Sequence, residues 1–271
     1  MKLLKEADES LSGERIATKL DVSRTTVWKM IDALRKQGYV IEGVQNLGYR
    51  LVSEPYLFSE EALRNRLSSD WKDLYIRCFE TITSTNIFAR AAVSDGKLPC
   101  LIVTNGQTSG RGRRGKAFLS PYHVGLFFSL AFPWNCEESP VLVTTMSSVA
   151  VCRVLERELG VRADIKREND IFFEDKKIGG ILTEEMSDPE SSEVKVIILG
   201  ISMNLEHPSE DYFVELQDKA GALSDAIDRT TIDADNPVFA EDEKGNLAFN
   251  RNTLTAMMIN ELAKIMHELP S

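Results

Sequence analysis

The first fifty residues carry apolar positions at helical spacing on both sides of a short polar turn. Val27, Ile31 and Leu34 stand at i, i+4 and i+7. This spacing places them on one face of a helix, which we expect over residues 24–37. A shorter apolar pattern predicts a partner helix over residues 12–20. The buried face of this first helix is expected to comprise Ile16, Ala17 and Leu20.

A β-hairpin is predicted directly after the second helix. Extended segments around Ile41 and Arg50 flank a polar tip that contains glycine. Two helices with a tight turn and a hairpin wing are typical of a winged helix-turn-helix domain, which meets DNA through the start of its second helix. A small helical protein-interaction module is the alternative. We interpret Trp28 as a packing residue, with base stacking as the alternative. The residues expected to contact DNA are Ser23, Arg24, Thr25, Thr26, Lys29, Gln45 and Asn46.

A proline at position 55 predicts a stiff linker after the hairpin. We therefore expect a winged helix-turn-helix domain over residues 1–53 and a larger domain over residues 54–271. In the larger domain, apolar runs separated by tight turns predict many strands and few helices, which is an α+β fold with a mixed or antiparallel sheet. The expected strands cover residues 76–80, 100–104, 124–132, 162–166, 171–173, 178–184 and 195–205, and the expected helices residues 59–67, 87–93, 141–159 and 251–268.

Charge is distributed unevenly along the chain. The 271 residues have a formal net charge of -10, but residues 1–52 hold nine Lys/Arg and seven Asp/Glu, a net of +2. Only this N-terminal part has a balance suited to nucleic acid. The four cysteines and three histidines lack metal-site spacing, which predicts reduced thiols and no zinc site. With no export signal and no apolar run of about 18 residues, we expect a cytoplasmic protein without membrane contact.

The most distinctive stretch of the larger domain is the loop over residues 110–116, Gly-Arg-Gly-Arg-Arg-Gly-Lys. Glycine permits close backbone approach and arginine matches carboxylate and phosphate oxygens, so the loop is suited to closing over an anion. A solvated turn is the alternative. A P-loop is disfavoured because Ala117 has no hydroxyl for a metal and Pro121 predicts a strand afterwards. The polar run over residues 83–86 either caps a helix or contacts a small ligand.

Five short motifs in the same order give the chain a resemblance to bifunctional biotin–protein ligases that are also biotin-operon repressors. The most specific is the family's Gly-Arg-Gly-Arg-x-Gly loop, which residues 110–115 match in full. The resemblance covers nearly the whole chain, and it implies a winged domain followed by a class II synthetase-like ligase domain. The other four motifs are Ser84-Thr85-Asn86, Gln107, Lys-x-x-Gly-Ile-Leu-x-Glu at residues 177–184 and Gly-Ile-x-x-Asn at residues 200–204.

The resemblance implies a two-step reaction in which biotin and ATP, with Mg²⁺, form biotinyl-AMP, and the biotinyl group then passes to a lysine of a biotin carboxyl carrier domain. It also implies operator DNA as a partner and a homodimer when ligand is bound. The protein alone is expected to fix no metal; Mg²⁺ would arrive with ATP, near Asp170. The implied catalytic residues are Arg113, Lys177, Lys166 and Asp170. The implied biotin contacts are Ser84, Thr85, Asn86, Gln107, Arg111, Gly112, Arg113, Lys177 and Gly180. The implied ATP or adenylate contacts are Gly110, Arg111, Arg113, Arg114, Gly115, Asn169 and Asn204.

Two departures from the family pattern leave an alternative open. The family's Lys-Trp-Pro-Asn-Asp segment reads Lys-Arg-Glu-Asn-Asp at residues 166–170, which changes the apolar wall and the rigidity of the turn beside the ligand. The small β-barrel that bifunctional members carry after the last helix is expected to be absent, because the sequence stops at Ser271. The alternative function is a ligand-sensing repressor with a degenerate, non-ligating domain. A lipoate-type ligase is a third and less favoured interpretation.

Overall fold

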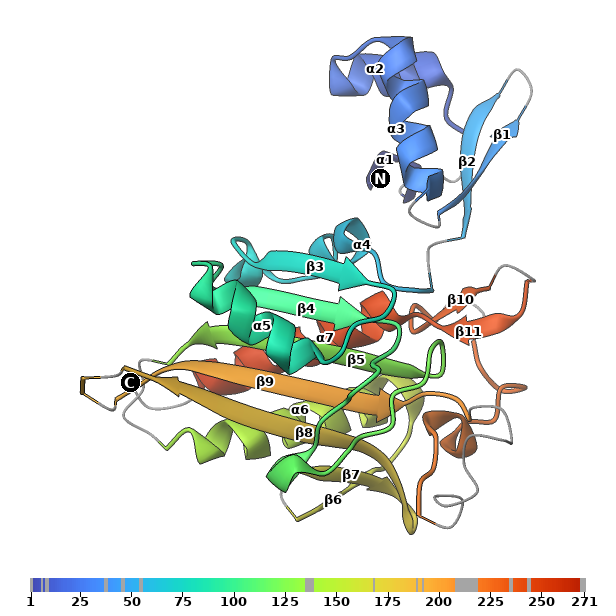
Figure 1. The fold of residues 1–271 in the computed structure, drawn as a ribbon. Coiled ribbons are helices and arrows are strands. Elements are labelled where there is room, and N and C mark those ends of the chain that lie inside the picture. The colour runs from blue at the N-terminus through green and yellow to red at the C-terminus, as the bar shows by residue number, and fades with distance from the viewer. Residues whose placement is uncertain are drawn as a thin grey trace.

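A small N-terminal unit and a larger unit built on one sheet make up the computed structural model (Figure 1). It describes residues 2–268 apart from residues 6, 8–9, 37–38, 45–46, 54–55, 135–138, 168, 189, 192, 208–218, 234–235 and 243–244. Four residues singled out from the sequence lie outside the described residues, namely Gln45, Asn46, Pro55 and Glu168.

The N-terminal unit contains the predicted pair of helices, α2 (Gly13–Leu20) and α3 (Arg24–Lys36). Each helix begins after a serine whose hydroxyl oxygen accepts a hydrogen bond from a backbone N–H three residues later. The distance is 3.1 Å for both Ser12 and Ser23, which satisfies N–H groups that a helix start leaves without partners. The remaining elements are α1 (Lys2–Lys5) and the antiparallel strands β1 (Val40–Val44) and β2 (Gly48–Ser53), which form the wing.

Burial in this unit confirms the predicted face of α3 and corrects two other residues. Val27, Ile31 and Leu34 are all buried. Leu20, however, is 43% exposed, because it is the last residue of α2 and lies at the edge of the packed face. Trp28 is 57% exposed, so its interpretation as a packing residue is wrong; it lies on the side of α3 turned away from the buried face.

The larger unit is built on a seven-stranded sheet in the order β3-β4-β5-β9-β8-β7-β6. Strands β3 and β4 are parallel, and every other neighbouring pair in this sheet is antiparallel, so the predicted mixed sheet and α+β class are confirmed. The strands are β3 (Tyr75–Phe79), β4 (Cys100–Thr104), β5 (Gly125–Pro133), β6 (Asp164–Lys166), β7 (Asp170–Phe173), β8 (Lys176–Ser187) and β9 (Val194–Asn204), with a separate hairpin of β10 (Phe239–Glu241) and β11 (Leu247–Phe249). The helices are α4 (Glu60–Arg64), α5 (Thr85–Ser94), α6 (Val141–Leu159) and α7 (Arg251–His267).

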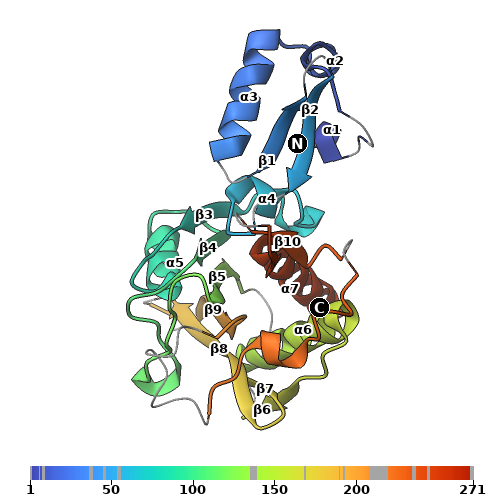
Figure 2. The same cartoon turned by 90° about the vertical axis from the view of Figure 1, so that its right-hand side faces the viewer.

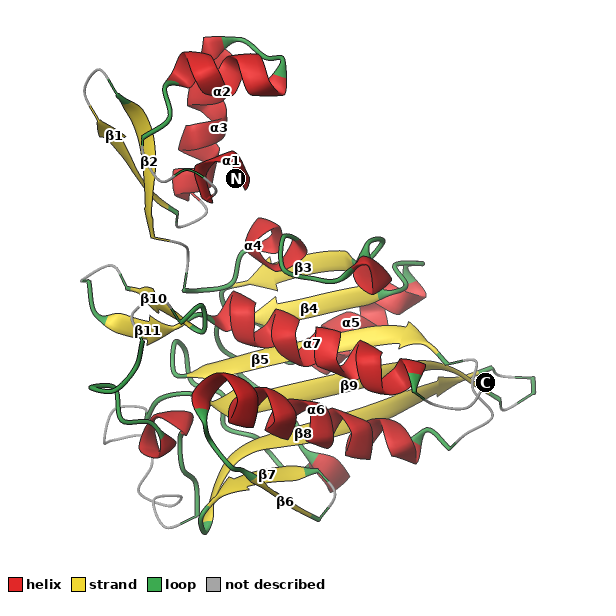
Figure 3. Ribbon diagram, turned by 180° about the vertical axis from the view of Figure 1, so that it is seen from behind, coloured by secondary structure: helices red, strands yellow, loops and turns green. Residues whose placement is uncertain are grey.

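The two faces of the sheet are covered differently. Helices α6 and α7 pack together over one face, and the main apolar core lies between them and the strands (Figure 3). Helix α5 and the long segment over residues 105–123 lie on the other face (Figures 1 and 2). Because only one helix covers this second face, the sheet there is open to a ligand. No helix among the described residues combines the length and the hydropathy needed to cross a lipid bilayer.

The two units meet through apolar and polar contacts at α4. Ala62 of α4 is fully buried in the apolar cluster of the N-terminal unit, together with Tyr39 and Leu4. Burial raises the pKa of the Tyr39 hydroxyl to about 12, and the charge of Glu61 on α4 adds to the rise. The N-terminal unit therefore lies directly against the first helix of the larger unit.

Candidate ligand site

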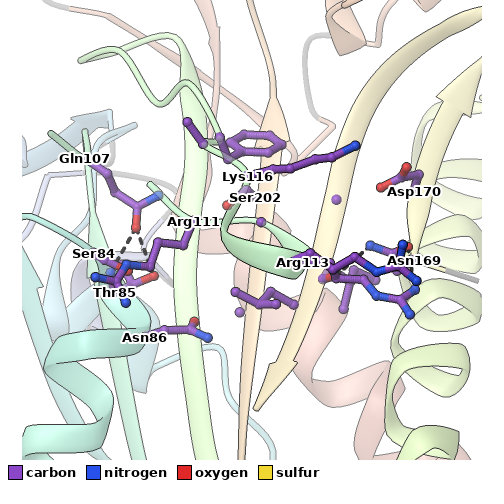
Figure 4. Close-up of a pocket in the computed structure, with 18 of the residues that line it drawn as sticks. Ser84, Thr85, Asn86, Gln107, Arg111, Arg113, Lys116, Asn169, Asp170 and Ser202 are labelled. Carbon is purple, nitrogen blue, oxygen red and sulfur yellow. Dashed lines mark hydrogen bonds between the residues drawn. The ribbon is translucent and has the colours of Figure 1, made fainter. Parts of the chain in front are cut away.

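A cavity of about 360 Å³ lies on the open face of the sheet, beneath the segment over residues 105–123 (Figure 4). Its volume is in the range of small-molecule sites. Ser84, Thr85, Asn86 and Gln107 lie at one end with Arg111 beside them, and Arg113, Asn169 and Asp170 lie at the other, while strands β8 and β9 form the floor (Figure 4). The lining residues are Ser84, Thr85, Asn86, Gln107, Arg111, Gly112, Arg113, Arg114, Lys116, Ala117, Phe118, Arg167, Asn169, Asp170, Lys177, Gly180, Ile181, Leu182, Gly200 and Ser202.

The polar end is organised by the first turn of α5. Ser84 precedes the helix, yet its side chain makes no capping hydrogen bond, so the residue is not explained by helix capping alone. The backbone N–H and the hydroxyl of Thr85 both donate to Gln107 Oε1, at 2.9 and 3.3 Å. Gln107 Nε2 in turn donates to Ser120 Oγ at 2.9 Å. The Gln107 amide is thus held in one orientation at the edge of the cavity (Figure 4).

Asn86 is fixed by partners that lie away from the cavity. Its Oδ1 accepts a hydrogen bond from the Ser129 hydroxyl on β5, at 2.5 Å. Its Nδ2 donates to a carboxylate oxygen of Glu184 on β8, at 2.8 Å. Asn86 and Thr85 are both buried, as is Ser129. Buried polar groups of this kind are costly without partners, so their geometry is tightly determined.

The loop over residues 110–116 folds as a narrow hairpin across the cavity. Gly112 N–H donates to the Lys116 carbonyl at 2.7 Å, and Phe118 N–H donates to the Gly110 carbonyl at 2.9 Å. Arg114 and Gly115 turn the chain at positive φ, 57° and 73°, which explains the glycine at the second position.

Arg113 reaches from this loop to the opposite wall of the cavity. Its guanidinium donates to Asn169 Oδ1 at 3.1 Å and to the Arg167 carbonyl at 3.4 Å (Figure 4). Asn169 is itself held by β8, because its side-chain amide donates to the Ile181 carbonyl at 3.1 Å and its own carbonyl accepts the Ile181 N–H at 2.8 Å. The loop is therefore closed onto a rigid strand in this structure.

The cationic end also contains one ion pair. Lys177 Nζ lies 2.6 Å from Asp170 Oδ1, and the same ammonium lies 5.7 Å from the centre of the Phe118 ring. Asp170 is the sole carboxylate among the described lining residues. Six residues that line the cavity are cations, so the cavity favours carboxylate or phosphate groups. They are Arg111, Arg113, Arg114, Lys116, Arg167 and Lys177.

Four residues expected at the site do not line the cavity. Lys166 extends along β7, with its Nζ 4.5 Å from the centre of the Phe172 ring and 3.7 Å from an Asp175 oxygen, so the structure does not bring it to the site. Asn204 donates to the Gly221 carbonyl at 2.9 Å, outside the cavity. Gly110 and Gly115 shape the loop instead: a Cβ on Gly110 would overlap the Phe118 carbonyl, and Gly115 has positive φ.

The described residues provide neither a metal-binding cluster nor a reactive thiol. No group of three or more His, Cys, Asp or Glu side chains in that part of the chain is arranged to hold a metal ion. Burial raises the pKa values of the Cys100 and Cys152 thiols to about 11, and that of Cys78 further. These three thiols are thus protonated and poor nucleophiles near neutral pH.

The expected DNA contacts lie together at the start of α3. Ser23, Arg24, Thr25, Thr26 and Lys29 are all exposed. The hydroxyls of Ser23 and Thr26 lie 2.8 Å apart, so the capping serine of α3 also contacts Thr26. Arg24 and Lys29 take part in no ion pair within the part of the chain that the structure describes.

Comparison with known proteins places this architecture in a family. Residues 1–50 match an HTH domain, and residues 76–204 match the biotin/lipoate A/B protein ligase family. The bifunctional ligase/repressor BirA of Bacillus spizizenii is 36% identical over 231 residues, which are 83% of this chain and 70% of the relative. The BirA protein of Bacillus subtilis is 35% identical over 232 residues, with the same two coverages. The chain belongs to the bifunctional ligase/repressor family.

The fold of this family member also resembles solved ligase structures. The biotin protein ligase from Aquifex aeolicus, determined in complex with biotin and ATP, aligns with a TM-score of 0.54 and 21% identity. The alignment covers 72% of this chain and 71% of that one, so the shared sheet architecture extends over most of the larger unit.

Several residues that line or support this cavity were not predicted from the sequence. Ser129 and Glu184 hold Asn86, and Phe118 and Ser202 line the cavity. Glu184 ends one recognised motif and Ser202 lies within another, so both had a usable signal. Ser129 and Phe118 had none, because a single serine or phenylalanine within an apolar strand or turn does not reveal what it faces.

Proposed function

We propose that the protein is a biotin–protein ligase that joins biotin and ATP to form biotinyl-AMP and then transfers the biotinyl group to a carrier lysine. The observation that carries the proposal is the polarity of the cavity. One end presents the fixed hydroxyl and amide groups of α5 and Gln107, and the other presents the cations Arg113 and Lys177. Biotin has a cyclic urea at one end and a carboxylate at the other, so both ends find complementary partners.

The urea of biotin would lie against the first turn of α5. A urea requires both hydrogen-bond donors and acceptors. Both are offered here by the hydroxyls of Ser84 and Thr85 and by the amides of Asn86 and Gln107. Their fixed geometry supports selectivity, because a ligand without these groups would leave buried polar atoms unpaired. This is the reason for preferring biotin over lipoate, whose ring carries no urea.

The carboxylate would lie at the cationic end, where the first reaction step takes place. A carboxylate oxygen of biotin attacks the α-phosphorus of ATP, and pyrophosphate leaves. Two anions must approach each other, so Lys177 and Arg113 would neutralise charge and orient the carboxylate and phosphate oxygens. Arg111 and Gly112 of the closed loop would cover the mixed anhydride and exclude water.

The second step, transfer of the biotinyl group, requires only that the amine of the carrier lysine can reach the bound adenylate. The carrier lysine attacks the acyl carbon of biotinyl-AMP, AMP leaves, and the amine loses a proton. The protein partner would be a biotin carboxyl carrier protein or domain. We assign no covalent role to a side chain of this protein.

Magnesium would be bound chiefly by the nucleotide. Asp170 is the sole carboxylate lining the described cavity, and it is paired with Lys177 at 2.6 Å, so the protein offers at most one acidic ligand. When bound, Mg²⁺ would screen the phosphate charges during adenylate formation. Arg114, Asn169 and the adjacent loop backbone would contact the adenylate.

The N-terminal unit, residues 1–53, would bind operator DNA in the cytoplasm as a ligand-controlled repressor. This role is supported by the helix-turn-helix geometry and by Arg24 and Lys29 at the start of α3, which form no ion pair with any residue that the structure describes. Ordering of the 110–116 loop on biotinyl-AMP would favour a homodimer, and two winged domains would then meet a palindromic operator.

The first experiment is incubation of the purified protein with biotin, ATP and Mg²⁺, followed by mass spectrometry with and without a biotin carrier domain. Biotinyl-AMP and a biotinylated carrier are expected. Adenylate without transfer would mean that its product serves mainly as a corepressor. Biotin binding without adenylate would overturn the ligase assignment and leave the ligand-sensing repressor. A parallel reaction with lipoate distinguishes the third interpretation.

A further inference from the structure

An open groove of about 840 Å³ lies in the N-terminal unit between the start of α3 and the wing. Arg24, Thr25 and Trp28 of α3 form one side, and Gly43 and Val44 of β1 belong to the other. The groove also contains the start of α2, including Glu14. Helix α3 thus presents a large aromatic ring between a cation and the wing.

Trp28 is unlike the other tryptophans of the chain. Trp71 and Trp134 are 8% and 5% exposed and belong to the main apolar core, whereas Trp28 is 57% exposed. Its neighbours in sequence explain why it cannot turn inward. Val27 and Ile31 already occupy the buried face of α3, and a residue adjacent to Val27 lies about 100° away around the helix. The exposed indole lines the same groove as Arg24, at the start of the helix that a helix-turn-helix unit presents to DNA.

The charge and shape of this surface select the partner. Arg24 lies one turn before Trp28, and Lys29 follows it directly; neither cation has an ion-pair partner among the described residues. A protein partner would need an acidic residue opposite each of these cations, whereas the major groove of DNA surrounds a helix with phosphates and presents apolar thymine methyl groups on its floor. Arg24 and Lys29 would meet phosphates on the walls while the indole reaches the base edges.

We propose that Trp28 is a sequence-reading residue, and that its indole contacts thymine methyl groups in the major groove of the operator. The inference rests on the proposed repressor function and adds the feature that its DNA-binding unit recognises. Trp28 would thus recognise apolar base edges, whereas Arg24 and Lys29 would position α3 in the major groove through contacts with phosphates. Loss of the indole should weaken sequence discrimination without changing the number of phosphates contacted.

Fluorescence provides the first test, because Trp28 is the only well-exposed tryptophan of the three, all of which are described. The probe is a duplex pool enriched by the wild-type protein from a randomised library in the presence of biotin, ATP and Mg²⁺. Acrylamide quenching is measured with and without this DNA, and Trp28→Phe supplies the background of the two buried tryptophans. We expect DNA to protect the Trp28 signal to the level of that background.

Removal of single methyl groups provides the decisive test. Thymines of the enriched duplex are replaced one at a time by uracil, which lacks only the 5-methyl group. Binding of the wild type should weaken by about fourfold at each contacted position. The Trp28→Ala variant should bind more weakly and should no longer respond to uracil at those positions. Its salt dependence should match the wild type, whereas Arg24→Ala should lower the salt slope by about one.

Met30→Ala is the matched control, because Met30 is exposed on the other side of α3 and does not line the groove. It should keep the uracil response, and all variants should keep biotin adenylation. Equal uracil responses in wild type and Trp28→Ala, or unchanged quenching on DNA, would overturn the assignment while leaving the repressor function intact. Failure of the wild type to enrich any duplex would overturn the repressor function and this inference together.

Discussion

Gly200 on β9 and Asn86 on α5 fit together only because residue 200 has no side chain. A Cβ atom at that position would overlap Asn86 Oδ1 and crowd the rest of the amide. Gly200 pairs with Ser129 in the sheet, and Ser129 is the residue whose hydroxyl donates to the same Oδ1 at 2.5 Å. The amide at the polar end of the cavity is therefore positioned by the sheet itself, through one missing side chain and one hydroxyl.

Gly200→Ala is expected to displace Asn86 and weaken biotin binding by about tenfold, which corresponds to about 1.4 kcal/mol. The KM for ATP should change little, because the cationic end of the cavity is untouched. Isothermal titration with biotin and steady-state kinetics of adenylation measure the two effects. Gly13→Ala in α2 is the matched control, since an added Cβ there makes only ordinary contact with Tyr49 at 3.5 Å. Equal biotin affinity in wild type and Gly200→Ala would show that Asn86 does not contact the ligand.

The secondary structure was predictable because the chain marks its elements locally. Helices α2, α3, α6 and α7 follow apolar spacing and have clear ends, and β4 was predicted at its observed bounds. The hairpin of β10 and β11 was missed, because each strand has three residues and the charged run between them resembled a solvated loop. It is held by a contact visible only in three dimensions: Phe239 and Phe249 pair across it with ring centres 5.1 Å apart.

The sequence motifs predicted which segments line the cavity, but they predicted less well which side chains of those segments reach it. The lining residues on the 110–116 loop and on α5 were singled out because their composition is unusual for a surface. Lys166 shows the limit of this reasoning. The family resemblance implied that both Lys166 and Asp170 reach the ligand, and the two residues do pair across β6 and β7. The side chain of Lys166 instead follows the Phe172 ring towards the turn at Asp175. Which groups a side chain such as that of Lys166 contacts depends on the folded structure, and the spacing of residues in the sequence does not reveal it.

Lys166, at the end of β6, and Lys177, near the start of β8, should therefore differ sharply in function. Lys177→Met removes the ammonium at the cationic end of the cavity, and we expect adenylate formation to slow by about 100-fold or more. Lys166→Met should leave the rate within about threefold, because its ammonium lies outside the cavity and its surface ion pair contributes little. Single-turnover release of pyrophosphate measures both. A large loss in Lys166→Met with an unchanged melting temperature would return Lys166 to the site.

Closure of the loop over residues 110–116 should depend on the hydrogen bond from Arg113 to Asn169, which is 3.1 Å long. A cycle of Arg113→Ala, Asn169→Ala and the double variant tests this coupling. The two changes should be non-additive by about 0.5–3 kcal/mol in the free energy of the adenylation barrier, as for directly contacting residues. Arg162→Ala in place of Arg113→Ala is the control pair, for which additivity with Asn169→Ala is expected, because Arg162 is exposed and does not line the cavity. Strict additivity in both cycles would mean that Arg113 acts without this contact.

Contact between the two units should weaken at high pH through Tyr39. Burial raises the pKa of its hydroxyl to about 12, with Glu61 adding to the rise and Arg66 opposing it. The folded state thus holds this proton more tightly than the unfolded chain, whose tyrosine pKa is about 10. The resulting stabilisation is fully present below pH 10 and is lost as the pH rises from about 10 to 12.

Tyr39→Phe cannot ionise and should lack this component of the pH dependence. The difference in unfolding free energy between wild type and Tyr39→Phe should be constant from pH 7 to 9. It should then move in favour of the variant by up to about 2 kcal/mol as the pH approaches 12. Urea unfolding at each pH measures the difference, and ionisation of lysines and exposed tyrosines cancels between the two proteins. Tyr49→Phe, at a partly buried tyrosine of the wing, is the control and should follow the wild type. Parallel curves for wild type and Tyr39→Phe up to pH 12 would show that Tyr39 is not buried at the contact with α4.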